Sequence, residues 1–233
     1  MGGAIACVFP GQGSQYVGMG QELHQLYPQV RETFAQASEV LGLDLASLCF
    51  EGPEEALTDT LNAQPSILTL SIALWRVLEG SPFDSCRPLF LAGHSMGEYS
   101  ALVAAGAVEF ADALQLVRQR GELMQAAGRE HPGGMAAVIG LGAVVVERVC
   151  ERVRAETGGV IGIADYNSPG QIVISGDKVS LERAIALARE GGARHVIPLA
   201  VSVAGHSAFM AHAAEALGEI LENTRIERVQ TPV

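Results

Sequence analysis

The sequence has few basic residues, no long apolar run and no pair of neighbouring cysteines. It contains 15 Lys and Arg against 26 Asp and Glu, which gives a formal net charge of -11. Because a general nucleic-acid binder needs clustered Lys and Arg, this charge argues against nucleic acid as a partner. No apolar run reaches the roughly 18 residues of a membrane span. The first residues also lack a basic segment followed by an apolar one, so we expect no membrane association and no signal peptide.

Cysteine is scarce, and none of the four cysteines belongs to a CxxC pair. They are Cys7, Cys49, Cys86 and Cys150. This spacing favours four reduced, buried thiols in a cytoplasmic protein and gives no sign of a metal site or of a disulfide framework. Apolar residues make up 48% of the chain and charged residues 18%, which is typical of a globular protein.

The first half of the chain contains apolar runs that alternate with helical patterns. Residues 4–9 and 88–92 predict strands, and the second run is continuously apolar, as in a buried parallel strand. Helical patterns cover 19–41, with a break at Pro28, and 65–79, where a proline stands in the first turn. This alternation predicts an α/β layer with a parallel sheet.

The pattern of predicted elements changes at a glycine- and proline-rich stretch that follows the helix predicted over 110–127. The segments after it predict the order βαββαβ, at residues 135–139, 144–156, 160–164, 171–175, 179–190 and 194–198. That order is ferredoxin-like. We predict a small domain over 128–198, inserted into a large domain made of 1–127 and 199–233. Since the chain stops on an extended, proline-containing segment, we expect that part of the large domain is missing at the C-terminus.

The segment GHSMGE, residues 93–98, places Ser95 between two glycines, after a predicted strand and before a predicted helix. This is the pattern of a nucleophile elbow, in which the glycines allow a sharp turn that exposes the serine hydroxyl. The helix N-terminus can stabilise a developing anion there. The pattern alone is equally compatible with a serine that only caps the helix.

An activated serine needs a base, and His206 is our candidate among six histidines. It lies in a loop that leads into a helix, where catalytic groups tend to collect. The turn FPGQGSQ, residues 9–15, has neither a P-loop lysine nor GxGxxG spacing, so nucleotide binding is disfavoured. The backbone N–H of Gln12 in this turn and that of Met96 can form an oxyanion hole. Alternatively, the segment is a tight turn and nothing more.

One arginine stands on the apolar side of a predicted helix. On a helical wheel, Arg120 lies inside the apolar arc of the helix over 110–127. A buried arginine is rare unless it is paired. The sequence slightly favours a core carboxylate as its partner. The alternative is a fixed cation that holds the carboxylate of a ligand through two parallel hydrogen bonds.

Five motifs occur in the order in which they are found in one enzyme family. They are FPGQGSQYVGMG, GHSMGEYSALVAAGA, RQRGELMQ, NSPGQIVISG and SVAGH. Together they resemble the malonyl-CoA:acyl-carrier-protein transacylases and the related acyltransferase domains of fatty-acid and polyketide synthases. The resemblance covers nearly the whole chain. It implies an α/β-hydrolase-like large domain with a ferredoxin-like small domain, and family members that extend past the last residue of this chain.

The resemblance also implies a role for each candidate residue. Ser95 matches the acylated nucleophile, His206 its base, and Arg120 the partner of the malonyl carboxylate, while the amides of Gln12 and Met96 match the oxyanion hole. The implied substrates are malonyl-CoA and acyl carrier protein. Coenzyme A is then part of a substrate, and no cofactor or metal is expected. In the implied ping-pong reaction, a malonyl-serine ester forms first and a phosphopantetheine thiol then accepts the malonyl group.

Two other functions are compatible with the same motifs. A serine esterase or thioesterase shares Ser95 and His206, but it gives no reason for Arg120 in an apolar arc and needs an acidic residue to orient the histidine. A truncated module that only docks a carrier protein never forms the serine ester.

Overall fold

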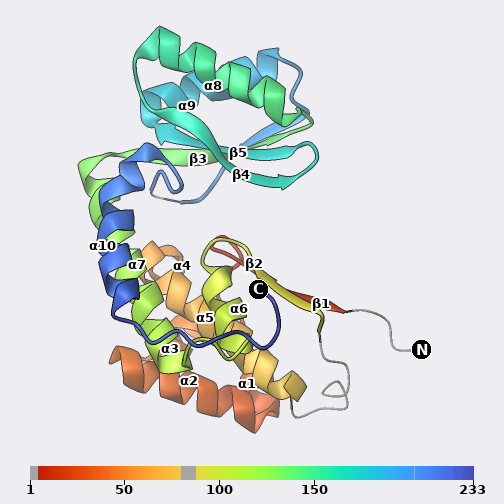
Figure 1. Cartoon of the computed structure of the whole chain (residues 1–233), viewed down its shortest axis with the longest axis vertical. Coiled ribbons are helices and arrows are strands. Elements are labelled where there is room, and N and C mark those ends of the chain that lie inside the picture. Colours follow the sequence, from red (N-terminus) through yellow and green to blue (C-terminus); the bar gives the residue numbers. More distant parts are fainter. Residues whose placement is uncertain (1–4, 80–87, 202) are drawn as a thin grey trace. The chain divides into compact units, whose positions relative to one another are not determined.

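The computed structural model describes residues 5–79, 88–201 and 203–233. The chain has an α/β fold, in which helices accompany one parallel and one antiparallel sheet (Figure 1). Within the described residues, no helix is both long enough and apolar enough to cross a membrane. Cys86 and Ser202, the first residue of the SVAGH motif, lie outside the described residues.

The chain divides into two compact units. The first unit takes in Met1–Gly121 and Glu219–Val233, and the second takes in Glu122–Gly218. Both divisions fall inside helices, namely α7 (Phe110–Glu130) and α10 (Ala211–Glu222). The domain limits at 127/128 and 198/199 stay a prediction.

The first unit contains a small parallel sheet. Strand β1 (Ala6–Phe9) pairs with β2 (Phe90–Gly93) in register from Ala6 opposite Phe90 to Phe9 opposite Gly93. The parallel pairing is therefore as predicted. The expectation that the second strand is buried on both faces is wrong for the described residues, since Leu91 is 2% exposed but Phe90 is 58% exposed.

The burial of this sheet follows the alternation of side chains along its strands. Leu91 and Phe9 share one face and pack against Ala101 and Ala105. Val8, on the other face, is 74% exposed. An uninterrupted apolar run therefore did not distinguish a strand covered on two faces from one covered on a single face.

The remaining elements of the first unit are helices. They are α1 (Gln21–Leu26), α2 (Pro28–Leu41), α3 (Leu45–Glu51), α4 (Glu54–Thr58), α5 (Thr60–Glu79) and α6 (Gly97–Ala104). The predicted break at Pro28 is confirmed, because Tyr27 ends α1 and precedes α2, whose first residue is the proline. The buried side chains of these helices form one core with those of α7, and Phe34, Leu68 and Leu114 lie in it.

Helix α5 begins earlier than its sequence pattern predicts. Pro65 was expected in the first turn, but the helix starts at Thr60 and so contains the proline in its interior. Proline has no N–H, so the carbonyl oxygen of Leu61, four residues earlier, loses its helical partner. Arg118 Nη1 donates to that oxygen at 3.3 Å. A side chain from α7 therefore satisfies the acceptor that the proline leaves open.

The second unit contains the predicted order of elements, βαββαβ. The elements are β3 (Gly133–Ile139), α8 (Ala143–Thr157), β4 (Ile161–Ser168), β5 (Gln171–Asp177), α9 (Lys178–Glu190) and β6 (His195–Pro198). The strands lie in the order β4-β5-β3-β6, and every neighbouring pair is antiparallel. Both helices lie on one side of this sheet (Figure 1). Val138 and Ile174 of the sheet and Val146 of α8 are fully buried in the core between them.

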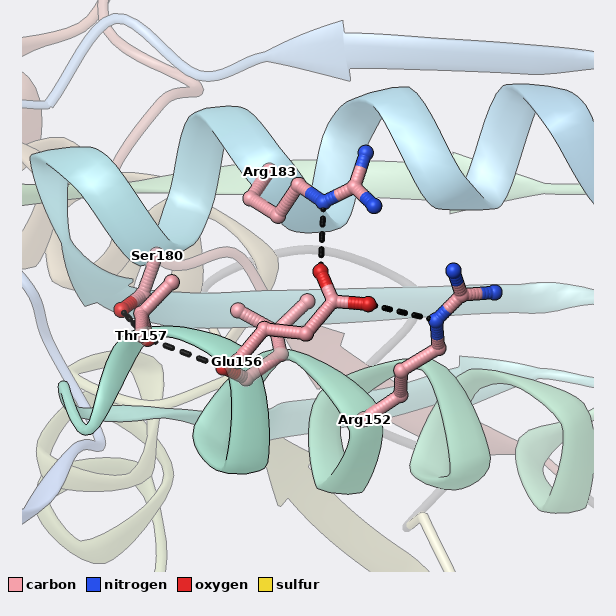
Figure 2. Close-up of polar contacts among 6 residues, drawn as sticks. Arg152, Glu156, Thr157, Ser180 and Arg183 are labelled. Carbon is pink, nitrogen blue, oxygen red and sulfur yellow. Dashed lines mark hydrogen bonds and ion pairs between the residues drawn. The ribbon is translucent and has the colours of Figure 1, made fainter.

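A carboxylate joins the two helices of the second unit at the surface. Figure 2 shows Glu156 of α8 between two arginines: its Oε1 accepts from Arg152 Nε and its Oε2 from Arg183 Nε of α9, each at 2.7 Å. These hydrogen bonds lower the pKa of Glu156 to about 2, and the one from Arg183 has the larger effect. Next to this group, Thr157 Oγ1 lies 2.9 Å from Ser180 Oγ.

The described cysteines are free thiols. Cys49 and Cys150 are buried, as expected, whereas Cys7 is only partly buried. Burial raises the pKa of both buried thiols to about 11. A thiol with so high a pKa is unreactive at neutral pH, which leaves these two cysteines a packing role.

Candidate active site

The segment between β2 and α6 is a sharp turn with Ser95 at its bend. Ser95 has φ 52°, in the left-handed region, which costs a non-glycine residue about 1–3 kcal/mol. An added Cβ at Gly93 would overlap the backbone of Gly97 and Glu98, and one at Gly97 would overlap the backbone of Phe9 and Pro10. Only glycine permits these approaches, so the turn has the geometry of a nucleophile elbow.

The alternative role for Ser95, as a helix cap, does not match this geometry. The N-cap position of α6 is occupied by Met96, and no side chain makes a capping hydrogen bond there. Ser95 precedes the cap, and its carbonyl oxygen accepts from Glu98 N at 3.1 Å. Its strained backbone is therefore not explained by helix capping.

The glycine-rich turn after β1 packs directly on the elbow. A Cβ at Gly11 would lie 2.5 Å from the carbonyl oxygen of His94. Within the described residues, the backbone N–H groups of Gln12 and Met96 donate no backbone hydrogen bond. These are the two amides expected in an oxyanion hole, and they belong to the two segments that this packing brings together.

Arg120 of α7 reaches the elbow serine. Its Nη2 donates to Ser95 Oγ at 3.1 Å, and its Nη1 donates to Gln64 Oε1 at 2.7 Å. Burial lowers the pKa of the Arg120 guanidinium, and the nearby Tyr99 and Glu98 side chains oppose this shift. A guanidinium nevertheless stays protonated in proteins.

The salt-bridge interpretation of Arg120 fails for the described part of the chain. Among those residues Arg120 forms no ion pair, and its hydrogen-bond partners are a hydroxyl and an amide, both neutral. Among the described residues its guanidinium is therefore not hydrogen-bonded to a carboxylate, which leaves it able to hold an anionic ligand.

Sequence reasoning missed two residues of this site, Thr60 and Gln64. Thr60 Oγ1 donates to Gln12 Oε1 at 2.7 Å and accepts from Gln64 Nε2 at 3.1 Å. Both residues were overlooked because α5 was expected to begin at Pro65. Their spacing of four residues, which places them on one face of a helix, was the available signal.

His206 belongs to the second unit, whereas Ser95, Arg120, Gln12 and Met96 belong to the first. His206 is the other described non-glycine residue with positive φ, at 55°. It lies in the loop between β6 and the short 3-10 helix η2 (Ala208–Met210). A Cβ at the preceding Gly205 would contact Met135 Sδ at 3.4 Å and Met124 Cε at 3.6 Å. The role of His206 as the base of Ser95 stays a prediction.

The described residues contain no group of three or more His, Cys, Asp or Glu that could hold a metal ion. The first unit instead brings together a serine with a strained backbone and a buried guanidinium that donates to its hydroxyl. Residues 6–232 match the family described as the acyl transferase domain.

The chain belongs to the acyl transferase domain family.

Curated members of this family are similar over nearly the whole chain. The malonyl CoA-acyl carrier protein transacylase of Haemophilus influenzae is 50% identical over 222 residues, which are 95% of this chain and 70% of that protein. The protein of the same name from Bacillus subtilis strain 168 is 49% identical over 229 residues, 98% of this chain and 71% of that one.

Solved structures of the acyl transferase family have the same fold. An acyl carrier protein S-malonyltransferase from Vibrio cholerae matches with a TM-score of 0.90 at 46% identity, over 98% of this chain and 73% of that one. A malonyl-transacylase in complex with its type II PKS acyl-carrier protein matches with a TM-score of 0.93 at 45% identity, over 99% of this chain and 74% of that one.

Proposed function

We propose that this chain transfers a malonyl group from malonyl-CoA to the phosphopantetheine thiol of an acyl carrier protein. The observation that carries this proposal is the hydrogen bond from Arg120 to Ser95 Oγ at 3.1 Å. It places a charged guanidinium, without a carboxylate partner in the described residues, beside the hydroxyl that would be acylated. The relatives that are 47–50% identical to this chain bear the name of this activity.

The first half of the reaction forms an ester on Ser95. Its hydroxyl oxygen attacks the thioester carbonyl of malonyl-CoA while His206 takes the hydroxyl proton. The N–H groups of Gln12 and Met96 stabilise the oxyanion, and the loss of one such donor typically costs about 3 kcal/mol of activation free energy. The C–S bond then breaks, and coenzyme A leaves as the thiol with the proton returned by His206.

The second half reverses the roles of nucleophile and leaving group. The phosphopantetheine thiol gives its proton to His206 and attacks the malonyl-serine carbonyl, and Ser95 leaves as the alcohol. In both halves Arg120 holds the free carboxylate of the malonyl group, for which the two N–H donors of a guanidinium fork are well matched.

We also propose a finer description of the two units. The first unit is an α/β-hydrolase-like domain, for which the parallel β1–β2 pair and the elbow after β2 are support. The second is a ferredoxin-like domain, for which the βαββαβ order and the strand order β4-β5-β3-β6 are support.

Intact-mass measurement after mixing with malonyl-CoA tests the proposed function. We expect a gain of one malonyl group that is absent in Ser95→Ala and is passed on when carrier protein is added. Arg120→Ala should lower the ratio of malonyl to acetyl acylation rates by about tenfold or more, the effect of losing a hydrogen bond to a charged group. Arg118→Ala is the matched control, because Arg118 binds Asn62 and Leu61 on the same helix pair.

Each rival function gives a different result in this experiment. An esterase or thioesterase releases free malonate at the same rate with and without carrier protein. A docking module binds carrier protein but gains no mass from malonyl-CoA. If Arg120→Ala leaves the malonyl preference unchanged, Arg120 does not hold the carboxylate.

A further inference from the structure

Two buried residues of the first unit, Thr60 and Gln64, have no part in the reaction as written above. We propose that they are positioning residues that fix the orientation of the Arg120 guanidinium. We also propose that the site prefers carboxylated acyl groups because the Gln64 side chain is uncharged and does not neutralise Arg120. This inference rests on the proposed function. It assigns part of the substrate selectivity to Thr60 and Gln64, two residues that do not contact the reacting atoms.

The contacts form one continuous series across three elements. Arg120 Nη1 donates to Gln64 Oε1 at 2.7 Å, Gln64 Nε2 donates to Thr60 Oγ1 at 3.1 Å, and Thr60 Oγ1 donates to Gln12 Oε1 at 2.7 Å. Gln64 is 0% exposed and Thr60 is 1% exposed. Arg120 also donates to Ser95 Oγ, so the series joins the serine to the turn that carries Gln12.

The orientation of the Gln64 amide follows from the arginine. A guanidinium can only donate, so Gln64 must present its amide oxygen to Arg120. The amide nitrogen of Gln64 then faces Thr60 and can only donate to it. Thr60 Oγ1 accepts from Gln64 and donates its own hydrogen to Gln12 Oε1. Reversing the Gln64 amide would leave its buried N–H groups facing the guanidinium, which is strongly unfavourable.

Close packing of two helices holds the series in place. A Cβ at Gly121, next to Arg120, would lie 3.0 Å from both Leu61 Cα and the carbonyl oxygen of Thr60. Helix α7 therefore approaches the first turn of α5 without an intervening side chain. Thr60 and Gln64 lie four residues apart on α5 and so share the face that meets Arg120.

The charge of the positioning residue decides what the arginine can still bind. A neutral amide aims the guanidinium and leaves its positive charge for the carboxylate of an acyl group. A glutamate at position 64 would pair with Arg120 inside the protein and cancel that charge. The site would then discriminate poorly between malonyl and acetyl groups.

A neighbouring pair on the same two helices provides a matched control. Arg118 Nη1 donates to Asn62 Oδ1 at 3.0 Å, and Asn62 Nδ2 donates to the carbonyl oxygen of Ala56 at 2.9 Å. Asn62 thus accepts from an arginine and donates to an oxygen, as Gln64 does. Arg118 contacts Asn62 and the carbonyl oxygen of Leu61, so a new charge at position 62 tests the general effect of adding a carboxylate between these two helices.

The decisive experiment compares acylation rates with malonyl-CoA and acetyl-CoA in Gln64→Glu and Asn62→Asp. We expect Gln64→Glu to lower the malonyl-to-acetyl ratio by about tenfold or more, the effect of losing one hydrogen bond to a charged group. Asn62→Asp should leave the ratio within about twofold of the wild type. An unchanged ratio in Gln64→Glu, or an equal fall in Asn62→Asp, overturns the proposal.

Neutral substitutions separate positioning from charge and cover the case in which Gln64→Glu does not fold. Gln64→Met keeps the charge of Arg120 available but removes its acceptor, so the ratio should lie between those of the wild type and Gln64→Glu. Thr60→Val removes the hydrogen bond to the Gln12 side chain, so it should slow acylation by both substrates with little change in the ratio of their rates. Thr60→Ser, which keeps the hydroxyl, should restore the rate. A wild-type ratio in Gln64→Met, or no rescue by Thr60→Ser, contradicts the positioning role.

A readout without turnover separates failure of this inference from failure of the proposed function. The side-chain Nε–H signal of Arg120 in NMR spectra, assigned by its loss in Arg120→Lys, reports the setting of the guanidinium directly. It should shift in Gln64→Met and in Thr60→Val but not in Asn62→Asp. If the wild type gains no malonyl group but these shifts occur, the proposed function fails and the positioning role stands. If the wild type is acylated but the Arg120 signal does not shift in Gln64→Met and Thr60→Val, the positioning role fails.

Discussion

The two units of this chain differ in what they bury. Seven of the described buried polar residues belong to the first unit, and only two belong to the second. Those of the first unit are Thr33, Thr60, Gln64, Ser66, Thr69, Ser71 and Ser100, and those of the second are Ser175 and Ser180. A buried polar group is destabilising unless it is hydrogen-bonded. Two of the seven, Thr60 and Gln64, meet this condition through the hydrogen bonds that link them to each other and to Arg120 and Gln12 of the candidate site.

The second unit follows the simpler rule for a stable layer. One face of its antiparallel sheet packs on two helices through aliphatic side chains, and its charged groups stay at the surface, as around Glu156. The comparison teaches that the second unit is held together by an aliphatic core, whereas the first unit also contains a buried polar series that reaches Ser95 through Arg120.

The largest effect is expected at the elbow of the first unit. In Gly93→Ala the new Cβ overlaps backbone atoms of Gly97 and Glu98, which cannot move aside as a side chain does. We expect the free energy of unfolding to fall by about 3 kcal/mol or more, measured by chemical denaturation, together with loss of Ser95 acylation.

A glycine of the second unit serves as the control for Gly93→Ala. Gly218 lies inside α10 with nothing within 4 Å of an added Cβ. Gly218→Ala should raise the free energy of unfolding by up to about 1 kcal/mol, because alanine favours a helix. Wild-type stability in Gly93→Ala would show that the elbow is not held by backbone packing.

A smaller effect is expected in the core of the second unit. Ile174 of β5 is 0% exposed, so Ile174→Ala should lower the free energy of unfolding by about 2–5 kcal/mol and Ile174→Val by about 0.5–1.5 kcal/mol. Thermal and denaturant unfolding measure both. Ser175→Ala, at the next residue, should be nearly neutral, because its buried hydroxyl has no partner among the described residues. Equal effects at both positions would contradict the assignment of the core to one face.

The smallest effect is expected from the surface carboxylate in Figure 2. The pKa of Glu156 is lowered from 4.5 to about 2, so its contribution to stability is complete above pH 4.5 and is lost as the pH falls toward 2. Stability curves of the wild type and Glu156→Gln should therefore differ at neutral pH and converge at pH 2. The difference should be small, because the ion pairs are exposed. The double variant Arg152→Gln/Arg183→Gln should lose the same pH dependence, and a curve for Glu156→Gln that stays parallel to that of the wild type contradicts this account.

The second unit was predictable because each of its elements is encoded locally. Its strands and helices alternate with short glycine-containing turns, and hydrophobic periodicity is sufficient to identify such segments. The first unit was predicted less well. The start of α5 was missed because Pro65 resembles a first-turn proline, and the carbonyl group that it leaves open is satisfied by Arg118, 57 residues away in the sequence.

The sequence by itself predicted the elbow, because the two glycines around Ser95 and the helix after them form a recognisable pattern within a few positions, although the close approach of Phe9 and Pro10 to Gly97 is tertiary. It also placed Arg120 on an apolar face. Whether a carboxylate or a neutral amide meets that arginine was decided only by tertiary structure, since Gln64 lies 56 residues away. Local patterns specify backbone conformation, whereas the partner of a buried charge depends on which helices pack together. Among the described residues Arg120 therefore meets a neutral amide and a hydroxyl rather than a carboxylate, and no local pattern around position 120 reveals this.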